Sequence, residues 1–335
     1  MIMTTLKELA MISGISKSTI SRVINNDPNV KAETREKVLE YVKKLDYKPN
    51  LVARSMVTGN LPLVLVIVGD IQNDYFARIV TGIESVLSEK DYLPVIFSTM
   101  YDEEKEKKIF EAVKYFKPAG MIPITGTSSA EFEAILKNTD CKTVLVNKDS
   151  AKLRLDEVLV DDFEAGYAAT KILIDNGHRC IAHMSGNSER SSISKSREQG
   201  YRQALEDTGI TVREELIFRG NLAMKSGYSL AEEIFQHKEI TAICSNNFLM
   251  SMGLIRYGRT IDRHLLKEYE LSCCEIVPEL YEHERISYAG ADLESIGGKA
   301  ARILLSRIEG SDEPRQKIFY SASKIYNAVR YKSLN

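Results

Sequence analysis

The sequence predicts a small all-α module of helix-turn-helix type followed by two doubly wound α/β lobes with parallel sheets. The chain has 335 residues, which is more than a single hydrophobic core usually holds. From Leu63 onward, continuous apolar strands alternate with amphipathic helices, a pattern typical of parallel sheets covered on both faces. Hydrophobic residues make up 44% of the chain and charged residues 27%, which indicates globular domains and excludes a disordered or collagen-like protein.

Two helices separated by a tight turn are predicted at the start of the chain. Thr5-Leu6-Lys7-Glu8 fits a capping box, so a first helix is expected over about residues 6–12. Ser13-Gly14 supplies a turn, and Ser16 caps a second helix that runs through about Ile24. This separation is that of a helix-turn-helix, and a third helix over about 32–45 closes the small core.

The second helix presents a polar and basic outer face, made of Lys17, Ser18, Ser21 and Arg22. Arginine pairs with guanine through two hydrogen bonds, lysine reaches the same acceptors, and serine bonds to bases or phosphates, so the face suits the DNA major groove. A solvated helix face without a partner is the alternative. The charge distribution favours a DNA partner for this part of the chain. Residues 1–60 carry ten Lys and Arg against six Asp and Glu, whereas the remaining residues carry 35 against 41.

A short apolar segment follows the third helix. Pro49 ends that helix, and Asn50 can cap a further helix that stops before Gly59. Helices below about 12 residues are marginal in water, so this one is expected to form only when something packs against it. A second copy of the segment and a DNA minor groove both fit, with Met56 as an apolar wedge between base steps.

The body divides into two series of alternating strands and helices. The first series is expected at 63–68, 76–88, 93–97, 104–116, 120–124, 130–137 and 143–146, and the second at 163–176, 180–184, 195–207, 223–235, 242–245, 249–257 and 270–273. Doubly wound sheets bind ligands at the carboxyl ends of their strands. The candidate ligand-binding side chains are therefore those near expected strand ends: Asp70, Gln72, Asn73, Phe76, Lys148, Arg197, Asn247 and Glu275.

Sequence features of several other protein classes are absent. No GxGxxG, GxxxxGK[ST], GxSxG or HExxH motif occurs, so no catalytic residue, metal site or cofactor is expected. The five cysteines are odd in number and lack CxxC spacing, which argues against a disulfide framework or a zinc site. No apolar run approaches the roughly 20 residues of a bilayer span, and the first residues lack a signal-peptide core, which predicts a cytoplasmic protein with no membrane partner.

The chain resembles the lac repressor family of bacterial transcription regulators. In the first sixty residues the matching motifs are Thr5-Leu6-Lys7-Glu8-Leu9-Ala10, residues 14–25, residues 34–39, residues 45–50 and Ala53-Arg54. In the body the matching motifs are residues 161–166, 177–182, 197–204 and 297–301. All of them fall in the order and spacing of the family, so the resemblance covers essentially the whole chain.

The resemblance implies a domain organisation. It predicts a helix-turn-helix headpiece over residues 1–49, a hinge helix and linker over 50–60, and a core over 61–335 that is similar to periplasmic binding proteins. The core is expected to have an N-lobe of about 61–160 plus 291–320 and a C-lobe of about 161–290 plus 321–335, with chain crossings near 160, 290 and 320. An effector site is expected between the lobes.

The resemblance also assigns roles to residues of the headpiece and the hinge. Lys17, Ser18 and Arg22 take base-reading positions, and Ala53 and Met56 belong to the hinge, where Met56 replaces the usual leucine and, being more flexible, is expected to bend DNA somewhat less. Positions that contact phosphates or position helices in the family are held by Thr5, Ser16, Ser21, Asn25, Thr34, Tyr47 and Asn50. Lys31 replaces a small hydroxyl residue that caps the third helix.

The expected cleft departs from the family pattern at several positions. Asp74 stands in place of proline, Asn147-Lys148 in place of Asp-Arg, Phe248 in place of aspartate, and Ser272-Cys273-Cys274-Glu275 in place of a Gly-aromatic-Asp-Asp run. Lys148 remains basic, and Arg197 matches the ligand-contacting arginine of the family. Because acidic acceptors are lost, the hypothesis is an effector with a phosphate, carboxylate or amide group, and a neutral sugar is the open alternative.

The resulting prediction is a homodimeric, sequence-specific DNA-binding transcription regulator, a repressor of carbohydrate-related genes. It would bind a palindromic operator and respond to a small effector in the cleft, namely a sugar, a sugar phosphate or another polar or anionic metabolite. The alternative is a solute-binding protein of an importer without a DNA role, which would carry a signal peptide instead of a basic leader. Enzymatic activity is not expected.

Overall fold

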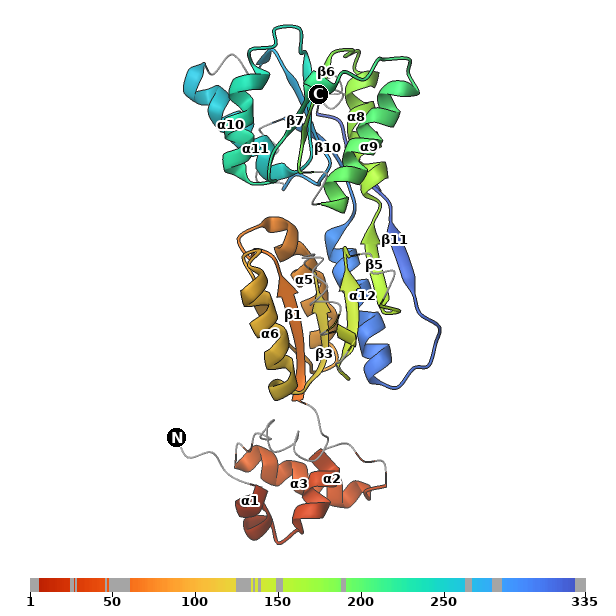
Figure 1. The fold of residues 1–335 in the computed structure, drawn as a ribbon. Coiled ribbons are helices and arrows are strands. Elements are labelled where there is room, and N and C mark those ends of the chain that lie inside the picture. The colour runs from red at the N-terminus through yellow and green to blue at the C-terminus, as the bar shows by residue number, and fades with distance from the viewer. Residues whose placement is uncertain are drawn as a thin grey trace.

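The computed structural model describes residues 6–24, 27, 29–45, 47, 61–124, 134, 136–137, 140–148, 153–187, 191–262, 267–278 and 285–328. They form a helical headpiece and two α/β lobes (Figure 1). The predicted hinge helix over 50–60 lies outside the described residues, as do Thr5, Asn25, Asn50, Ala53 and Met56 and most of the helix predicted at 130–137.

The headpiece consists of α1 (Leu6–Ser13), α2 (Lys17–Ile24) and α3 (Ala32–Lys44), close to the predicted ranges. The Ser16 hydroxyl accepts a hydrogen bond from the Thr19 N–H at 3.1 Å, so the predicted cap of α2 is present. Lys31 makes no capping bond at the start of α3. The core of the headpiece is formed by Leu9, Ile20, Val23, Val38 and Tyr47.

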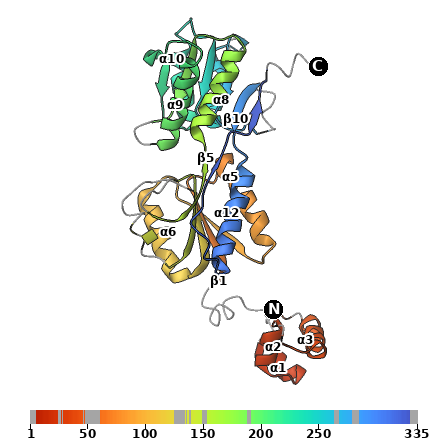
Figure 2. The same ribbon diagram turned by 90° about the vertical axis from the view of Figure 1, so that its right-hand side faces the viewer.

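The N-lobe is built on a parallel sheet with the strand order β11-β5-β4-β3-β1-β2. Its strands are β1 (Leu61–Val68), β2 (Leu93–Ser98), β3 (Pro118–Pro123), β4 (Lys142–Val146), β5 (Asp156–Val160) and β11 (Lys317–Tyr320). Helices α5 (Asp74–Ser88) and α12 (Leu293–Ile308) cover one face and α6 (Glu103–Phe116) covers the other (Figure 2).

Residues of β1 alternate between the two cores of the N-lobe. Val64 and Val66 pack in the cluster that contains α5 and α12, whereas Leu65 and Ile67 pack in the cluster that contains α6. All four are at most 1% exposed. A strand buried on both faces needs the continuous apolar run that the sequence has here.

The C-lobe is built on a sheet with the order β12-β10-β9-β8-β6-β7. Its strands are β6 (Ile181–Ser185), β7 (Ile217–Arg219), β8 (Ala242–Ser245), β9 (Glu270–Cys273), β10 (Ile286–Gly290) and β12 (Lys324–Tyr326), and a 3₁₀ turn at Glu214–Leu216 precedes β7. One face is covered by α8 (Asp162–Asp175) and α9 (Ser192–Glu206), and the other by α10 (Met224–Ile234) and α11 (Phe248–Ile261).

One strand departs from the predicted parallel arrangement. Edge strand β12 pairs antiparallel with β10, whereas the other pairs of the C-lobe sheet are parallel. The antiparallel direction follows from the path of the chain, because β12 follows β11 of the N-lobe after a short connection rather than a crossover helix.

The chain passes between the lobes three times. It crosses from β5 to α8, from β10 to α12, and from β11 to β12, as the two stacked lobes of Figure 1 show. The first and third crossings are joined, because the Asp161 N–H donates to the Tyr320 carbonyl at 2.8 Å. These two connections therefore run side by side.

Glycines allow the helix pairs to approach closely. A Cβ atom on Gly166 of α8 would lie 2.1 Å from the carbonyl oxygen of Arg197 on α9, and one on Gly200 would lie 2.1 Å from the carbonyl oxygen of Phe163. Both distances are far inside van der Waals contact, so the crossing of α8 and α9 requires glycine on both helices. The position of the Arg197 backbone depends on this contact.

Candidate functional site

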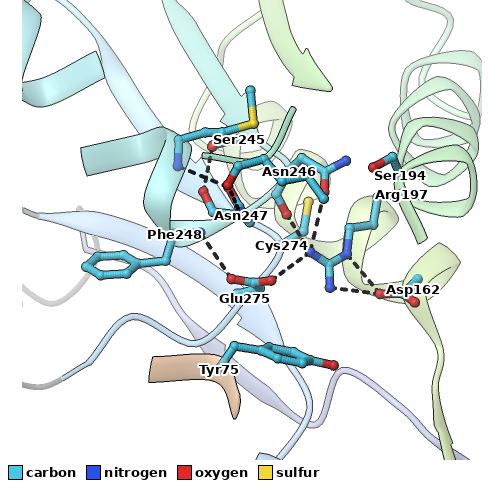
Figure 3. A network of polar contacts seen from close by, with 12 residues as sticks. Tyr75, Asp162, Ser194, Arg197, Ser245, Asn246, Asn247, Phe248, Cys274 and Glu275 are labelled. Carbon is cyan, nitrogen blue, oxygen red and sulfur yellow. Dashed lines mark hydrogen bonds and ion pairs between the residues drawn. The ribbon is translucent and has the colours of Figure 1, made fainter. Parts of the chain in front are cut away.

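The candidate site lies where the C-lobe strands end toward the N-lobe. Asn246 follows β8 and Glu275 lies two residues after β9, and because these strands are parallel neighbours their ends share one edge of the sheet. Asp162 is the first residue of α8, directly after the first crossing. Figure 3 shows these three residues around the guanidinium of Arg197, which comes from α9.

Arg197 is the centre of a buried polar network and is only 2% exposed. Its Nε donates to Asp162 Oδ1 at 2.8 Å, and its Nη1 donates to the Asn246 carbonyl at 2.6 Å and to Glu275 Oε1 at 3.1 Å (Figure 3). The Nη2 atom lies 2.8 Å from the same Asp162 oxygen. The sequence prediction placed Arg197 and Glu275 in one site, and the structure brings them together.

Burial and charge act in opposite directions on this network. Burial disfavours the charge of Arg197, but the carboxylates of Asp162 and Glu275 outweigh it and raise the pKa of the guanidinium. Burial raises the pKa of Asp162 above its usual range, and Arg197 only partly offsets this effect. The network is therefore an ion cluster with two carboxylates and one permanent cation.

The start of α11 holds the second oxygen of Glu275. The Phe248 N–H donates to Glu275 Oε2 at 3.2 Å, where the helix dipole favours negative charge. The neighbouring Asn247 accepts from the Met250 N–H at 3.0 Å and donates to the Leu222 carbonyl at 2.8 Å. Its side chain thus caps α11 and ties it to the loop before α10.

The N-lobe contributes aromatic side chains from the start of α5. Phe76 packs edge-on against Tyr75, with ring centroids 5.3 Å apart, and near Tyr101 at 6.5 Å. The Tyr75 hydroxyl is buried and has no hydrogen-bond partner among the described residues. The Tyr75 ring lies beside the C-lobe network (Figure 3), and burial, followed by the charge of Asp162, raises its pKa.

The other N-lobe candidates shape the turn before α5 or follow β4. Asp70 accepts from the Gln72 N–H at 2.9 Å, and Asn73 caps α5 by accepting from the Tyr75 N–H at 3.0 Å. Gln72 is exposed, and Lys148 is buried just after β4. These bonds fix the direction in which α5 presents its first aromatic residues.

A hollow of about 240 Å³ adjoins the network at the crossings. It is lined by Asn147, Leu159, Val160, Asp161, Asp162, Phe163, Ser192, Ile193, Ser196 and Phe319. Asn147 Oδ1 accepts from the Val160 N–H at 2.9 Å, while its Nδ2 is buried without a partner among the described residues. The hollow thus joins strand ends of the N-lobe to the first turns of α8 and α9.

Sequence reasoning missed three members of this site: Tyr75, Asp162 and Asn246. Tyr75 directly precedes the predicted Phe76, and Asp162 follows a strand, β5, that was not predicted. A strand at 156–160 would have placed Asp161 and Asp162 at a carboxyl end, the rule that selected the other candidates.

The headpiece places the predicted recognition residues on α2. Lys17, Ser18 and Arg22 are exposed, and Ser16 bonds to the Ser18 hydroxyl at 2.9 Å. Arg22 Nε donates to Asp27 Oδ2 at 2.8 Å, a bond that lowers the pKa of Asp27. Thr34 is half-buried on α3 and Tyr47 is buried in the headpiece core, where it holds helices together.

Neither a metal centre nor a membrane span is found in the described part of the chain. No group of three His, Cys, Asp or Glu side chains there is arranged to hold a metal ion. None of the described helices is both long and apolar enough to cross a membrane.

Comparison with known proteins gives matches over both the headpiece and the core. The family model of bacterial regulatory proteins of the lacI family matches residues 5–50, and the model of periplasmic binding proteins and the sugar binding domain of the LacI family matches residues 62–273. The match over 5–50 speaks against the alternative of a solute-binding protein without a DNA role.

Individual relatives cover most or all of the chain. The HTH-type transcriptional regulator DegA of Bacillus subtilis (strain 168) is 30% identical over 76% of this chain and 77% of its own length. The HTH-type transcriptional repressor PurR of Vibrio cholerae serotype O1 (strain M66-2) is 30% identical over 99% of both chains. The fold matches the lac repressor dimer bound to operator and the anti-inducer ONPF with a TM-score of 0.81, at 20% identity over 98% of this chain and 99% of that one.

These matches agree with the helix-turn-helix headpiece and the two six-stranded lobes described above. The matches together cover both the headpiece and the core. The chain belongs to the lacI family of bacterial regulatory proteins and is a DNA-binding transcription regulator, not an enzyme.

Proposed function

We propose that this regulator is a repressor of carbohydrate-related genes that binds a palindromic operator as a homodimer and is controlled by a small effector in the cleft between its lobes. The observation that carries the proposal is the α2 surface, where Lys17, Ser18 and Arg22 are exposed on a short helix of a helix-turn-helix. The similarity to a protein named a repressor and the match to a sugar binding domain support the remaining parts.

The recognition residues have matching chemistry. Arg22 is held by the 2.8 Å bond from Nε to Asp27, and its two Nη groups can pair with guanine O6 and N7. Lys17 and Ser18 extend the same surface. The phosphate-contacting or helix-positioning roles proposed for Thr5, Ser16, Ser21, Asn25, Thr34, Tyr47 and Asn50, and the hinge roles of Ala53 and Met56, complete the DNA-binding set.

An exposed sheet edge supports dimerisation. β2 ends the N-lobe sheet, and its Leu93 and Ile96 are 50% and 39% exposed. An edge strand with exposed apolar side chains is normally covered in a stable protein. Two copies joined through this edge would bring two headpieces to one duplex, which is why a palindromic operator is expected.

The cleft has the arrangement needed for allosteric control. The C-lobe supplies Asp162, Arg197, Asn246 and Glu275, and the N-lobe supplies Tyr75 and Phe76. A ligand that contacts both sets binds one arrangement of the lobes better than another. It can therefore shift the population of the DNA-binding arrangement by as much as its two affinities differ.

A fluorescence-anisotropy titration tests the DNA-binding part. Labelled DNA from the promoter beside the regulator's own gene is expected to bind on the order of 10³-fold or more tightly than random DNA of equal length. Arg22→Ala should weaken promoter binding by about 1–3 kcal/mol and lower the preference for that sequence. Asn50→Ala should weaken binding to all sequences more evenly.

Arg259→Ala serves as the matched control, because Arg259 is exposed on α11 of the C-lobe and its removal changes the net charge equally. It should leave promoter binding unchanged. Equal affinities of the parent protein for promoter and random DNA would refute the proposal.

A further inference from the structure

We infer that the effector carries an ammonium group on a hydroxyl-rich body, such as an amino sugar, and that this group is seated against the carboxylates of the hollow. The inference rests on the proposed function of the cleft and narrows the class of its ligand. It differs from the hypothesis drawn from the sequence, in which Lys148 and Arg197 favour a phosphate or carboxylate.

The first observation is that Arg197 is already occupied. Its Nε, Nη1 and Nη2 atoms all contact acceptors within the protein, namely Asp162, the Asn246 carbonyl and Glu275. At 2% exposure it offers almost no surface to a ligand. An anionic effector would have to displace a carboxylate from this arginine, so the side chain that suggested an anion does not provide a free anion site.

The second observation is an excess of negative charge. Asp161, Asp162 and Glu275 stand against a single guanidinium. The N-termini of α8 and α11 add only about half an elementary positive charge each. Among these groups about one negative charge is left uncompensated, and a cationic ligand group would neutralise it.

The third observation is the lining of the hollow. Asp161 and Asp162 lie side by side in it, and no lysine or arginine is among the described residues that line it, although Lys148 directly follows the lining residue Asn147. One oxygen of Asp161 accepts from the Glu164 N–H at 2.9 Å, and the side chain remains half-exposed. A positive group placed in the hollow would therefore meet two carboxylates.

Neutral polar groups surround these charges. Ser192, Ser196 and Asn147 line the hollow, and the Asn147 Nδ2 has no partner among the described residues. At the network, the Nδ2 of Asn246 and the hydroxyl of Tyr75 are also buried without partners there, and Asn246 is 0% exposed. Hydroxyl groups both donate and accept, so a polyhydroxyl body would satisfy these atoms as the ammonium satisfies the carboxylates.

The potential of the site agrees with this assignment. Burial, followed by the charges of Asp70 and Glu275, raises the pKa of Tyr101 to about 12. Asp162 and Tyr75 are shifted in the same direction, and Glu275 contributes to both shifts. Burial is the largest cause of all three shifts, and the charge of Glu275 adds to each of them.

Calorimetric titration of the full chain with matched sugars tests the inference. The probes are glucose, glucosamine and glucose 6-phosphate, together with galactose, galactosamine and galactose 6-phosphate, so that each set has one neutral sugar, one with an amine at C2 and one with a phosphate at C6. In at least one set the amine should bind about tenfold or more tightly than the neutral sugar, a difference of about 1.4 kcal/mol, and the phosphate should bind most weakly.

Asp161→Asn is the decisive variant, because asparagine still caps α8 while one carboxylate is removed from the hollow. It should reduce the preference for the amine to less than about threefold, and Glu275→Gln should act in the same direction. Asp207→Asn, at the end of α9 and hydrogen-bonded to Tyr167, removes the same charge away from the cleft and should leave the preference unchanged.

The inference is overturned if the phosphate or the neutral sugar binds as tightly as the amine in both sets, if no probe binds, or if the amine preference survives Asp161→Asn. Such failures are distinguishable from failure of the proposed function, because promoter binding by the same preparation is measured without any sugar. Promoter binding with no amine preference would leave a DNA-binding regulator whose effector belongs to another class.

Discussion

Replacing Arg197 by methionine should expose how much the cleft network stabilises the C-lobe. Methionine nearly fills the volume of the arginine stem, but it leaves Asp162 and Glu275 without the cation that they share. Asp162 is only 9% exposed. Removing one partner of a buried ion pair typically costs about 3–5 kcal/mol, because the remaining charge is buried without compensation. Arg197→Met is therefore expected to lower the free energy of unfolding by about that amount at neutral pH.

The stability lost in Arg197→Met should depend on pH. The folded pKa of Asp162 is already raised above its usual value by burial, and loss of Arg197 should raise it further. A carboxyl group whose folded pKa exceeds its unfolded pKa binds more protons in the folded state, so its unfavourable contribution is full at high pH and fades as pH falls through the folded pKa. The deficit of Arg197→Met should thus shrink in mild acid.

Urea unfolding followed by circular dichroism measures these quantities at neutral and mildly acidic pH. A triple variant that adds Asp162→Asn and Glu275→Gln to Arg197→Met removes the stranded charges and should recover at least half of the loss. A loss below about 1 kcal/mol, or one that does not change with pH, would show that the ion cluster is not the buried, mutually dependent unit described above.

Three further outcomes are expected. Gly166→Ala should destabilise the α8–α9 pair by about 1–3 kcal/mol in urea unfolding, because its Cβ would lie 2.1 Å from the Arg197 carbonyl oxygen, whereas Gly298→Ala, with its nearest atom at 3.5 Å, should be neutral or slightly stabilising. Arg307→Met should lower the melting temperature mainly above about pH 4. Burial alone would raise the pKa of Asp156, but the ion pair with Arg307 lowers it. The stabilisation by the Asp156–Arg307 pair is therefore present above the usual aspartate pKa and is lost in acid. Ile96→Arg should shift the protein from dimer to monomer in light scattering, and an unchanged mass would place the dimer interface elsewhere.

The regular elements of the fold were largely predictable from local pattern. Continuous apolar runs predicted β1, β3, β4 and β8, and capping chemistry predicted the headpiece helices. The elements that were not predicted are helix α12, the 3₁₀ turn before β7 and five strands. β7 and β12 have only three residues each, which is too few to show the alternation of apolar and polar residues typical of a strand. β11 lies at a sheet edge, and half of its residues are exposed. β5 and β10 carry buried polar residues, Asp156, Glu157 and Ser287, which interrupt the apolar pattern.

The site was predictable in part, for a related reason. Rules about strand ends select Arg197 and Glu275 individually, but they do not reveal that the two side chains bind each other. That contact joins residues 78 positions apart, and the Asp162 contact joins residues 35 positions apart. The expectation of an anionic ligand followed from counting basic residues without their partners. A charge is available to a ligand only when the fold leaves it unpaired, and this is a tertiary property.

The position of the network explains how a ligand could act at a distance. Asp162 is one residue beyond the crossing residue Asp161, whose N–H is bonded to Tyr320 of the third crossing at 2.8 Å. Glu164, in the first turn of α8, accepts from the Ala322 N–H of the same crossing at 3.2 Å. A ligand that pulls on Asp162 therefore acts on the first turn of α8, to which two of the three connections are attached. Tyr75 lies beside this network from the N-lobe (Figure 3), so under the proposed function it and the adjacent Phe76 would contact a cleft ligand only while the lobes are close. Contacts made only in the closed arrangement would set the free energy by which an effector can shift the lobes, so under the proposed function these aromatic contacts would limit that shift, however tightly the carboxylates of the C-lobe hold the effector.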